Sequence, residues 1–140
     1  MNKPILSTKA STLASLEGKI TSARVQPLEY FTVADWQSNP TDVLNCLLKR
    51  FGEAVPLVVR SSALNEDSST ASMAGYYTSV LHVQGAEVLR SAIDEVIESF
   101  GAGANPQDEV LVQPMLEGVR LSGVVFSHDP STGSPYRVIN

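Results

Sequence analysis

The sequence predicts an α+β domain with a mixed or antiparallel sheet flanked by helices. Amphipathic helix-like segments alternate with short β-branched or aromatic segments over residues 8–100, and the remainder contains three strand-like segments joined by short turns. A chain of 140 residues with 43% hydrophobic residues is also large enough to bury one compact core. Together these observations favour a single folded unit in which the last three strands form an antiparallel meander.

The first part of the chain predicts two helices around one strand. Residues 8–17, "TKASTLASLE", form an amphipathic helix with Ser7 or Thr8 as its N-cap. Aromatic and β-branched side chains then predict a strand at residues 29–33. Residues 42–51, "DVLNCLLKRF", return to helical spacing, and a glycine follows each helix and ends it.

The middle of the chain predicts two strands and a longer helix. The strand at residues 56–60, "PLVVR", places Val58 and Arg60 on one face, and residues 77–83 alternate like a second strand. Residues 86–100 have the spacing of an amphipathic helix. The apolar face predicted for this helix consists of Val88, Ile93, Val96, Ile97 and Phe100.

The last third of the chain predicts the three strands of the meander, at residues 109–116, 120–130 and 135–140. Pro114 lacks a backbone N–H, so it suggests an edge strand or a bend. The final segment stops at Asn140 without a cap or a polar tail. We therefore expect residues 1–140 to be excised from a longer protein.

Composition excludes several classes of partner. The formal net charge of -5 gives no general attraction to nucleic acid or to an acidic membrane, so any anion site must be local. Cys46 is the single cysteine and lies in the apolar run "VLNCLL", which predicts a small core residue in a reducing, cytoplasmic setting. No apolar segment is long enough to cross a bilayer.

The stretch "VVRSSALNEDSSTASMAGYY" contains the strongest candidate site. Arg60 ends a predicted strand beside a loop rich in hydroxyl and acidic residues, and two partners remain open for its guanidinium. One is an ion pair with Glu66 or Asp67, which fixes the loop. The other is a phosphate, since arginine has a planar fork of donors, Gly75 lets backbone N–H groups approach an anion, and Thr78 adds a hydroxyl.

Three further residues have side chains that can bind an anion or a metal. Lys9 lies near the positive end of the first predicted helix, where it is either a second phosphate ligand or simply solvated. His82 and His128 have no cysteine or carboxylate at ligand spacing, so we expect a structural role for both and assign no metal ligand.

Four stretches match a known family in order and spacing. They are "TKASTLASL", "VQPLEYFTV" with its following tryptophan, "VVRSSALNEDSSTASMAGYYTSVLHV" and "VLVQPMLEGVRLSGVVFSHDPSTG". Together they resemble the amino-terminal ATP-grasp region of phosphoenolpyruvate synthase and pyruvate phosphate dikinase. The resemblance implies the first lobe of an ATP-grasp fold and covers nearly the whole chain.

The resemblance also implies roles for individual residues. Lys9 and Arg60 would grip the β- and γ-phosphates of ATP under a mobile loop that contains Gly75 and Thr78. The strand from Gln113 to Met115 would face the adenine. Because Pro114 has no N–H, we expect the Gln113 C=O and the Met115 N–H to bond the base, with the Met115 thioether packed on the ring plane.

The activity implied by the resemblance needs parts beyond this chain. Magnesium ligands are expected in a missing second lobe, and a phosphohistidine domain would carry phosphate from ATP to pyruvate or another small acceptor, such as an antibiotic or a sugar. The 140-residue chain would be inactive alone. The alternative is a stand-alone, non-catalytic interaction module that keeps the same fold.

Overall fold

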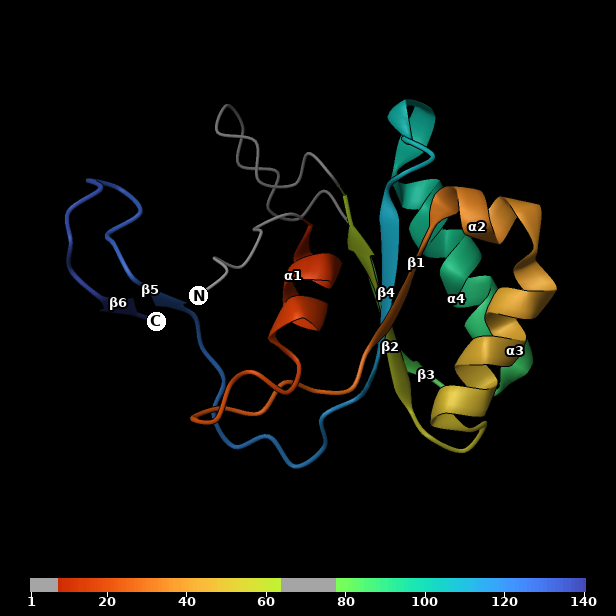
Figure 1. Ribbon diagram of the computed structural model, residues 1–140, viewed down its shortest axis with the longest axis horizontal. Helices are drawn as coiled ribbons and strands as arrows, with labels where there is room; N and C mark the ends of the chain where they lie inside the picture. The colour runs from red at the N-terminus through yellow and green to blue at the C-terminus, as the bar shows by residue number, and fades with distance from the viewer. Residues whose placement is uncertain (1–7, 64–77) are drawn as a thin grey trace.

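A computed structural model describes residues 8–63 and 78–140, and its centre is a four-stranded antiparallel sheet (Figure 1). The strands lie in the order β1-β4-β2-β3. Their bounds are Glu29–Thr32 for β1, Leu57–Ser62 for β2, Ser79–Val83 for β3 and Glu109–Pro114 for β4. The prediction of an α+β domain with an antiparallel sheet flanked by helices is confirmed.

Helices cover the two faces of this sheet unequally. Figure 1 shows α2, α3 and α4 together on one face and α1 alone on the other. The helices are α1 (Lys9–Leu16), α2 (Val33–Ser38), α3 (Pro40–Phe51) and α4 (Ala86–Ser99), and a short 3₁₀ turn, η1 (Gly101–Gly103), follows α4. The face that carries α1 is therefore only partly covered.

Strand β4 is one of the two interior strands of the sheet and is not part of a meander. It pairs with β1 on one side and with β2 on the other, both antiparallel. Strands β5 (Val125–Phe126) and β6 (Val138–Ile139) pair with each other in a separate hairpin. The predicted meander is wrong, and so is the edge strand suggested for Pro114, because β4 is an interior strand in which Pro114 lies opposite Leu57. The alternative, a bend at Pro114, stays a prediction.

The main core lies between the sheet and helices α2 to α4. Leu57 and Val59 of β2 point into it, on the face opposite to Val58 and Arg60. The buried residues of α4 are Leu89, Ala92, Ile93 and Val96. The prediction for Val88 is wrong, since this side chain precedes the buried stripe by one residue and is 52% exposed.

Helix α3 buries one stripe and exposes the opposite one. Leu47 is buried, and the side chains one turn before and after it, Val43 and Phe51, pack on the core. Cys46 lies on the other side of the helix and is exposed, so its predicted core position is wrong. Gly52 ends the helix with a φ of +83°, in the region that glycine tolerates best.

Helix α1 is fixed to the opposite face of the sheet by its first residues. Thr8 caps the helix by accepting a hydrogen bond from the Ser11 N–H at 3.1 Å, and its hydroxyl also bonds the Glu109 carboxylate. The Ala10 N–H donates to Ser62 Oγ at 2.9 Å. These contacts place the amino end of α1 against the ends of two neighbouring strands, β2 and β4.

Helix α2 begins directly after β1 and has a reciprocal cap. The Asp35 N–H donates to Thr32 Oγ1 at 3.1 Å, and the Thr32 N–H donates to Asp35 Oδ2 at 2.9 Å. The hydrogen bonds from the Thr32 side chain and backbone hold the pKa of the Asp35 carboxyl below its usual value. This cap lets the chain turn from strand to helix without an intervening loop.

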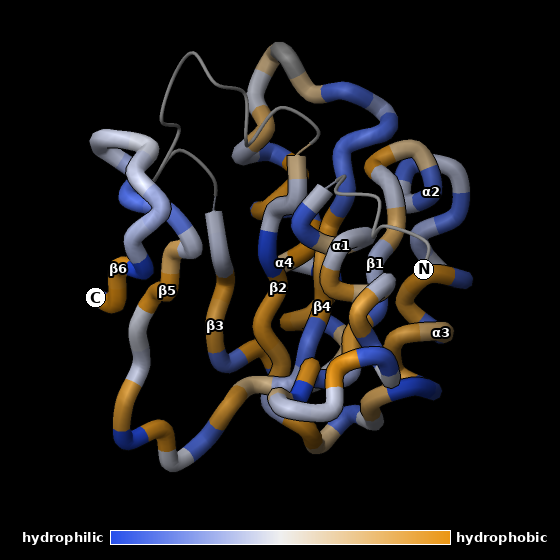
Figure 2. Tube along the Cα trace, turned by 60° about the vertical axis from the view of Figure 1, so that its left-hand side comes forward, coloured by the Kyte–Doolittle hydropathy of each residue, from blue (hydrophilic) through white to orange (hydrophobic). Residues whose placement is uncertain are grey.

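The β5–β6 hairpin lies apart from the rest of the domain in both ribbon and tube views (Figures 1 and 2). Its apolar side chains meet little protein, with Val125 67% exposed and Ile139 76% exposed. The backbones of Val124 and Asn140 exchange two hydrogen bonds of 3.0 Å beside the hairpin.

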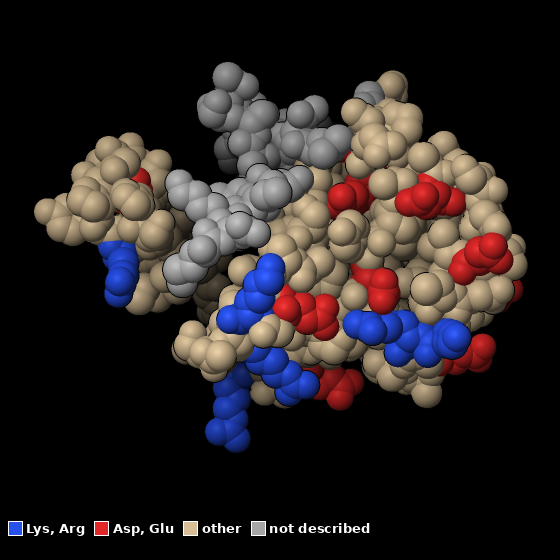
Figure 3. Space-filling view, in the orientation of Figure 1, with Lys and Arg blue, Asp and Glu red and all other residues tan. Residues whose placement is uncertain are grey.

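Acidic side chains lie between the basic ones on the face in Figure 3, so that face has no continuous basic surface. None of the helices in the described part of the chain is long and apolar enough to span a membrane.

Candidate functional site

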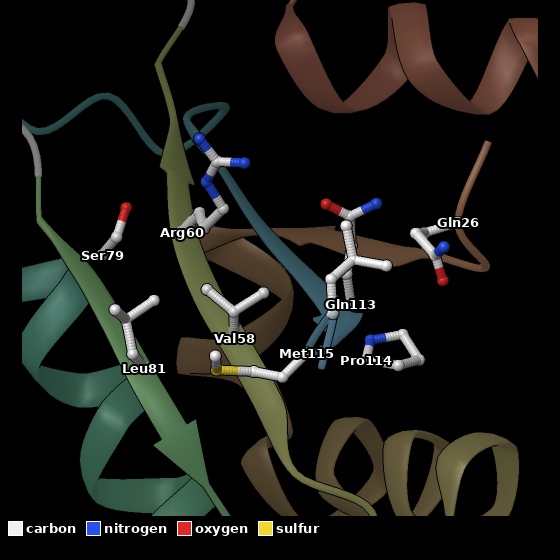
Figure 4. Close-up of a pocket in the computed structure, with 9 residues that line it drawn as sticks. Gln26, Val58, Arg60, Ser79, Leu81, Gln113, Pro114 and Met115 are labelled. Atoms are coloured by element: carbon white, nitrogen blue, oxygen red, sulfur yellow. The ribbon is translucent and has the colours of Figure 1, made fainter. Parts of the chain in front are cut away.

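An open pocket of about 310 Å³ lies on the sheet face that α1 leaves uncovered (Figure 4). Strands β2, β3 and β4 and the segment after β4 form its floor and sides. It is lined by Gln26, Val58, Arg60, Ser79, Leu81, Gln113, Pro114, Met115 and Leu116. A volume near 300 Å³ is at the small end of ligand-binding pockets.

Strand alternation explains why these side chains meet. Val58 and Arg60 alternate with the core residues of β2, so they point to the opposite face. Gln113 lies opposite Val58 on the neighbouring strand, and it points to the same face. The pocket therefore has an apolar floor with polar groups near its edge, as binding sites for small molecules commonly have.

Arg60 is half-buried at one end of the pocket. In Figure 4 its guanidinium extends toward the end of β2, away from the Met115 sulfur. No carboxylate of residues 8–63 or 78–140 forms an ion pair with it. The two acidic residues considered as its partners, Glu66 and Asp67, lie outside the described residues, and so does Gly75.

Lys9 lies on the same face and toward the same end of the sheet as Arg60. It begins α1, and the next residue, Ala10, bonds Ser62, which is two positions after Arg60 on β2. Thr78 directly precedes β3, and its C=O accepts a hydrogen bond from the Ser61 N–H at 3.3 Å. Lys9 and Thr78 thus flank the arginine end of the pocket without lining its floor.

The structure contradicts one part of the predicted adenine contact. The Met115 N–H donates to the Pro56 C=O at 2.8 Å, which continues the pairing of β4 with β2 by one residue. A single N–H engaged in this way is not available to a base, so the predicted Met115 N–H donor is wrong. The Met115 side chain does line the pocket, as does the Gln113 side chain.

Four residues of the pocket were not predicted. Ser79 and Leu81 follow from the alternation of β3 once that strand is known to pair with β2. Leu116 directly follows the segment from Gln113 to Met115, whose role in the pocket was predicted. Gln26 precedes β1 in a segment without regular structure, and nothing in its local sequence indicates its position.

Metal binding has no candidate cluster in the described part of the chain. No group of three or more histidine, cysteine, aspartate or glutamate side chains there could hold a metal ion. His82 is exposed on β3 and His128 is exposed before the final hairpin strand.

Comparison with known proteins identifies similar sequences. The family model described as "Pyruvate phosphate dikinase, AMP/ATP-binding domain" matches residues 7–104, more than half of the chain. The prodigiosin synthesizing transferase PigC of Serratia marcescens is 32% identical over 100 residues, which cover 65% of this chain and 11% of the relative. The uncharacterized phosphotransferase YvkC of Bacillus subtilis (strain 168) is 32% identical over 89 residues, or 54% of this chain and 11% of the relative. The chain thus spans about a tenth of the length of these two relatives.

Proposed function

Because the chain belongs to the pyruvate phosphate dikinase AMP/ATP-binding family, we propose that the pocket beside α1 holds the ATP of a phosphotransferase that resembles phosphoenolpyruvate synthase. One observation carries the assignment of the site. Arg60 stands half-buried at the polar end of an otherwise largely apolar pocket, and no carboxylate of the described residues pairs with it. An aromatic base would contact the side chains at the apolar end, and the phosphates would bond the guanidinium at the other end.

The base would rest on the apolar floor of this pocket. Val58 and Leu81 supply aliphatic surface, and the polarizable Met115 thioether suits an aromatic ring. The Gln113 side-chain amide replaces the predicted backbone pair, because it has a carbonyl to accept from the adenine amino group and an NH₂ to donate to a ring nitrogen. Its position at the pocket edge supports this assignment.

The phosphates would extend toward Arg60 and the amino end of α1. The guanidinium can bond two phosphate oxygens at once, and Lys9 adds a second positive charge from the helix on the same face. Gly75 and Thr78 are proposed to belong to the loop that closes over the nucleotide. These residues position ATP and neutralise its charge, which is most of what a protein does in phosphoryl transfer.

The whole protein would contain parts that this chain lacks. We assign residues 1–140 to the amino-terminal lobe of an ATP-grasp domain, with Mg ligands in a second lobe. Magnesium supplies charge neutralisation between the phosphates when it is bound. Phosphate would pass through a phosphohistidine on another domain to pyruvate or another small acceptor, in the cytoplasm. The much greater length of both relatives supports this arrangement.

A matched pair of substitutions tests the location of the nucleotide. Leu81 is 56% exposed in the pocket, and Val88 is 52% exposed on α4 behind the sheet. A carboxylate under a bound base is desolvated, so Leu81→Asp should weaken ATP binding by about tenfold or more in calorimetry, the equivalent of about 1.4 kcal/mol. Val88→Asp should leave ATP affinity unchanged. Equal affinities in the two variants would remove the nucleotide from this pocket.

A further inference from the structure

Strand β3 contains a bulge directly beside the pocket. Val80 lies opposite Val59 and Val83 lies opposite Leu57, so the register shifts between these two pairs. Two residues of β3, Leu81 and His82, therefore face one residue of β2. The extra residue lets Val83 enter the core while Leu81 faces the pocket, which a regular strand would not allow.

His82 is the residue that makes this bulge possible. Its φ is +57°, and among the described residues it is the one non-glycine residue whose φ is positive. Histidine enters this left-handed region more readily than branched residues do. The bulge turns the His82 N–H out of the ladder, and that N–H donates to the Met115 sulfur at 3.2 Å.

Met115 is consequently held at both ends. Its backbone N–H bonds the Pro56 C=O, and its sulfur accepts the hydrogen bond from the β3 bulge. Figure 4 shows the side chain running from the end of β4 across β2, with its sulfur beside Val58 and Leu81. A methionine side chain has three rotatable bonds and adapts to many shapes, so a fixed end selects one of them.

We propose that His82 is a positioning residue, whose left-handed backbone holds the Met115 thioether flat across the pocket as the surface that receives the nucleotide base. The identity of the ligand rests on the proposed function above. The ordering of Met115 by the bulge does not, because both hydrogen bonds join Met115 to protein groups. The exposed imidazole has no part in this role, so glycine should replace histidine without loss.

Two variants at one position separate the backbone role from the side chain. His82→Gly keeps the left-handed conformation, whereas His82→Val opposes it, because branched residues rarely adopt a positive φ. The control is His128→Val, the same substitution at the other histidine of the chain, which is exposed and lies outside the four-stranded sheet. Thermal unfolding checks that each variant is folded.

The first readout needs no nucleotide. Met115 labelled with ¹³C in its ε-methyl group should give one shifted resonance in the wild type, in His82→Gly and in His128→Val. In His82→Val the resonance should move toward the value of a freely rotating methionine. An unchanged resonance in folded His82→Val would overturn the positioning role, whatever the pocket binds.

The second readout divides the ligand into its two halves. His82→Val should bind adenosine up to about tenfold more weakly, which is the upper range for a sulfur–aromatic contact, while inorganic tripolyphosphate binds as before. His82→Gly should restore adenosine affinity. If the wild type binds neither adenosine nor ATP, the proposed function fails, and the methyl resonance still tests the positioning role.

A third variant decides the matter if His82→Val does not fold. Met115→Leu keeps the side-chain volume and removes the sulfur acceptor. The His82 amide should then exchange with solvent faster than in the wild type, and adenosine affinity should fall while tripolyphosphate affinity does not. Equal exchange rates in the two proteins would overturn the proposal.

Discussion

Replacement of Arg60 tests the phosphate end of the site most directly. Arg60→Gln removes the positive charge and keeps a polar side chain, and Arg60→Lys keeps the charge but removes the planar fork. Both changes lie on the pocket side of β2, away from the core residues Leu57 and Val59, so the fold should survive.

The expected loss follows from the position of the guanidinium. Two unit charges about 4 Å apart near a protein surface attract by about 4 kcal/mol at an effective dielectric constant near 20. Arg60 is only half-buried in an open pocket, and screening reduces this to about 2 kcal/mol. Arg60→Gln should therefore weaken ATP binding by about 30-fold. Arg60→Lys should lose about tenfold, because the second parallel hydrogen bond is lost.

Calorimetry with ATP and with adenosine at two salt concentrations measures this effect. Adenosine affinity should be equal in the wild type and both variants, and the salt dependence of ATP binding should fall in Arg60→Gln. Lys49→Gln is the matched control, since Lys49 is exposed on α3, behind the sheet. In the longer protein proposed above, Arg60→Lys should lose most of the activity. If both variants bind ATP as tightly as the wild type, Arg60 does not bind phosphate, and the alternative interpretation, an ion pair with Glu66 or Asp67, is favoured.

Four further outcomes are expected. The 140-residue chain alone should release no phosphate from ATP with Mg²⁺, because we place the metal ligands in another lobe, and metal-dependent turnover by the purified chain would contradict this. Asp35→Asn should lower the free energy of unfolding by about 0.5 kcal/mol at neutral pH. Because the pKa of Asp35 in the folded protein lies below 3.8, the difference in unfolding free energy should persist at pH values above 3.8 and disappear as the pH falls through the folded pKa. Urea unfolding at neutral pH and at a pH below the folded pKa measures this. Trp36→Phe should lower the free energy of unfolding by about 2 kcal/mol in urea, since the buried indole N–H donates to Asp94 Oδ1 at 2.8 Å. Asp94→Asn is the control and should cost less, because the asparagine side chain still has an acceptor. If the two variants cost the same, this hydrogen bond is not the cause. The exposed hairpin should cause self-association that Val125→Lys reduces, and a strict monomer in sedimentation at high concentration would refute this.

Local patterns predicted most of the elements of the fold. Thr8 caps the first helix and Gly52 ends α3 because capping depends on a few neighbouring residues. Helix α2 was missed although Thr32 and Asp35 have the spacing of a capping box, because the strand pattern of residues 29–33 obscured it. Cys46 was misplaced because an apolar run was read without its helical phase.

Pairing between distant segments could not be predicted. The residues of β4 indicate a strand, but nothing in residues 109–114 says that β1 and β2 lie on either side of it. The same limitation applies to the site. Alternation predicted that Val58 and Arg60 share one face of their strand, whereas the hydrogen bond between His82 and Met115 depends on a bulge in another strand.

The interior position of β4 also determines when the domain can fold. Strands β1 and β2 come from the first half of the chain and do not pair with each other; β2 also pairs with β3, whereas β1 pairs only with β4, which ends at residue 114. During synthesis β1 has no strand partner in this sheet until that point, and contacts between such distant segments form slowly.

The family match ends at residue 104, before β4 begins at Glu109. A fragment with that boundary would lack the strand that supplies Val110 and Val112 to the core and Leu111 to the opposite face. Ribosome-bound chains should therefore reach full protease resistance only after the last residues of β4 have left the exit tunnel.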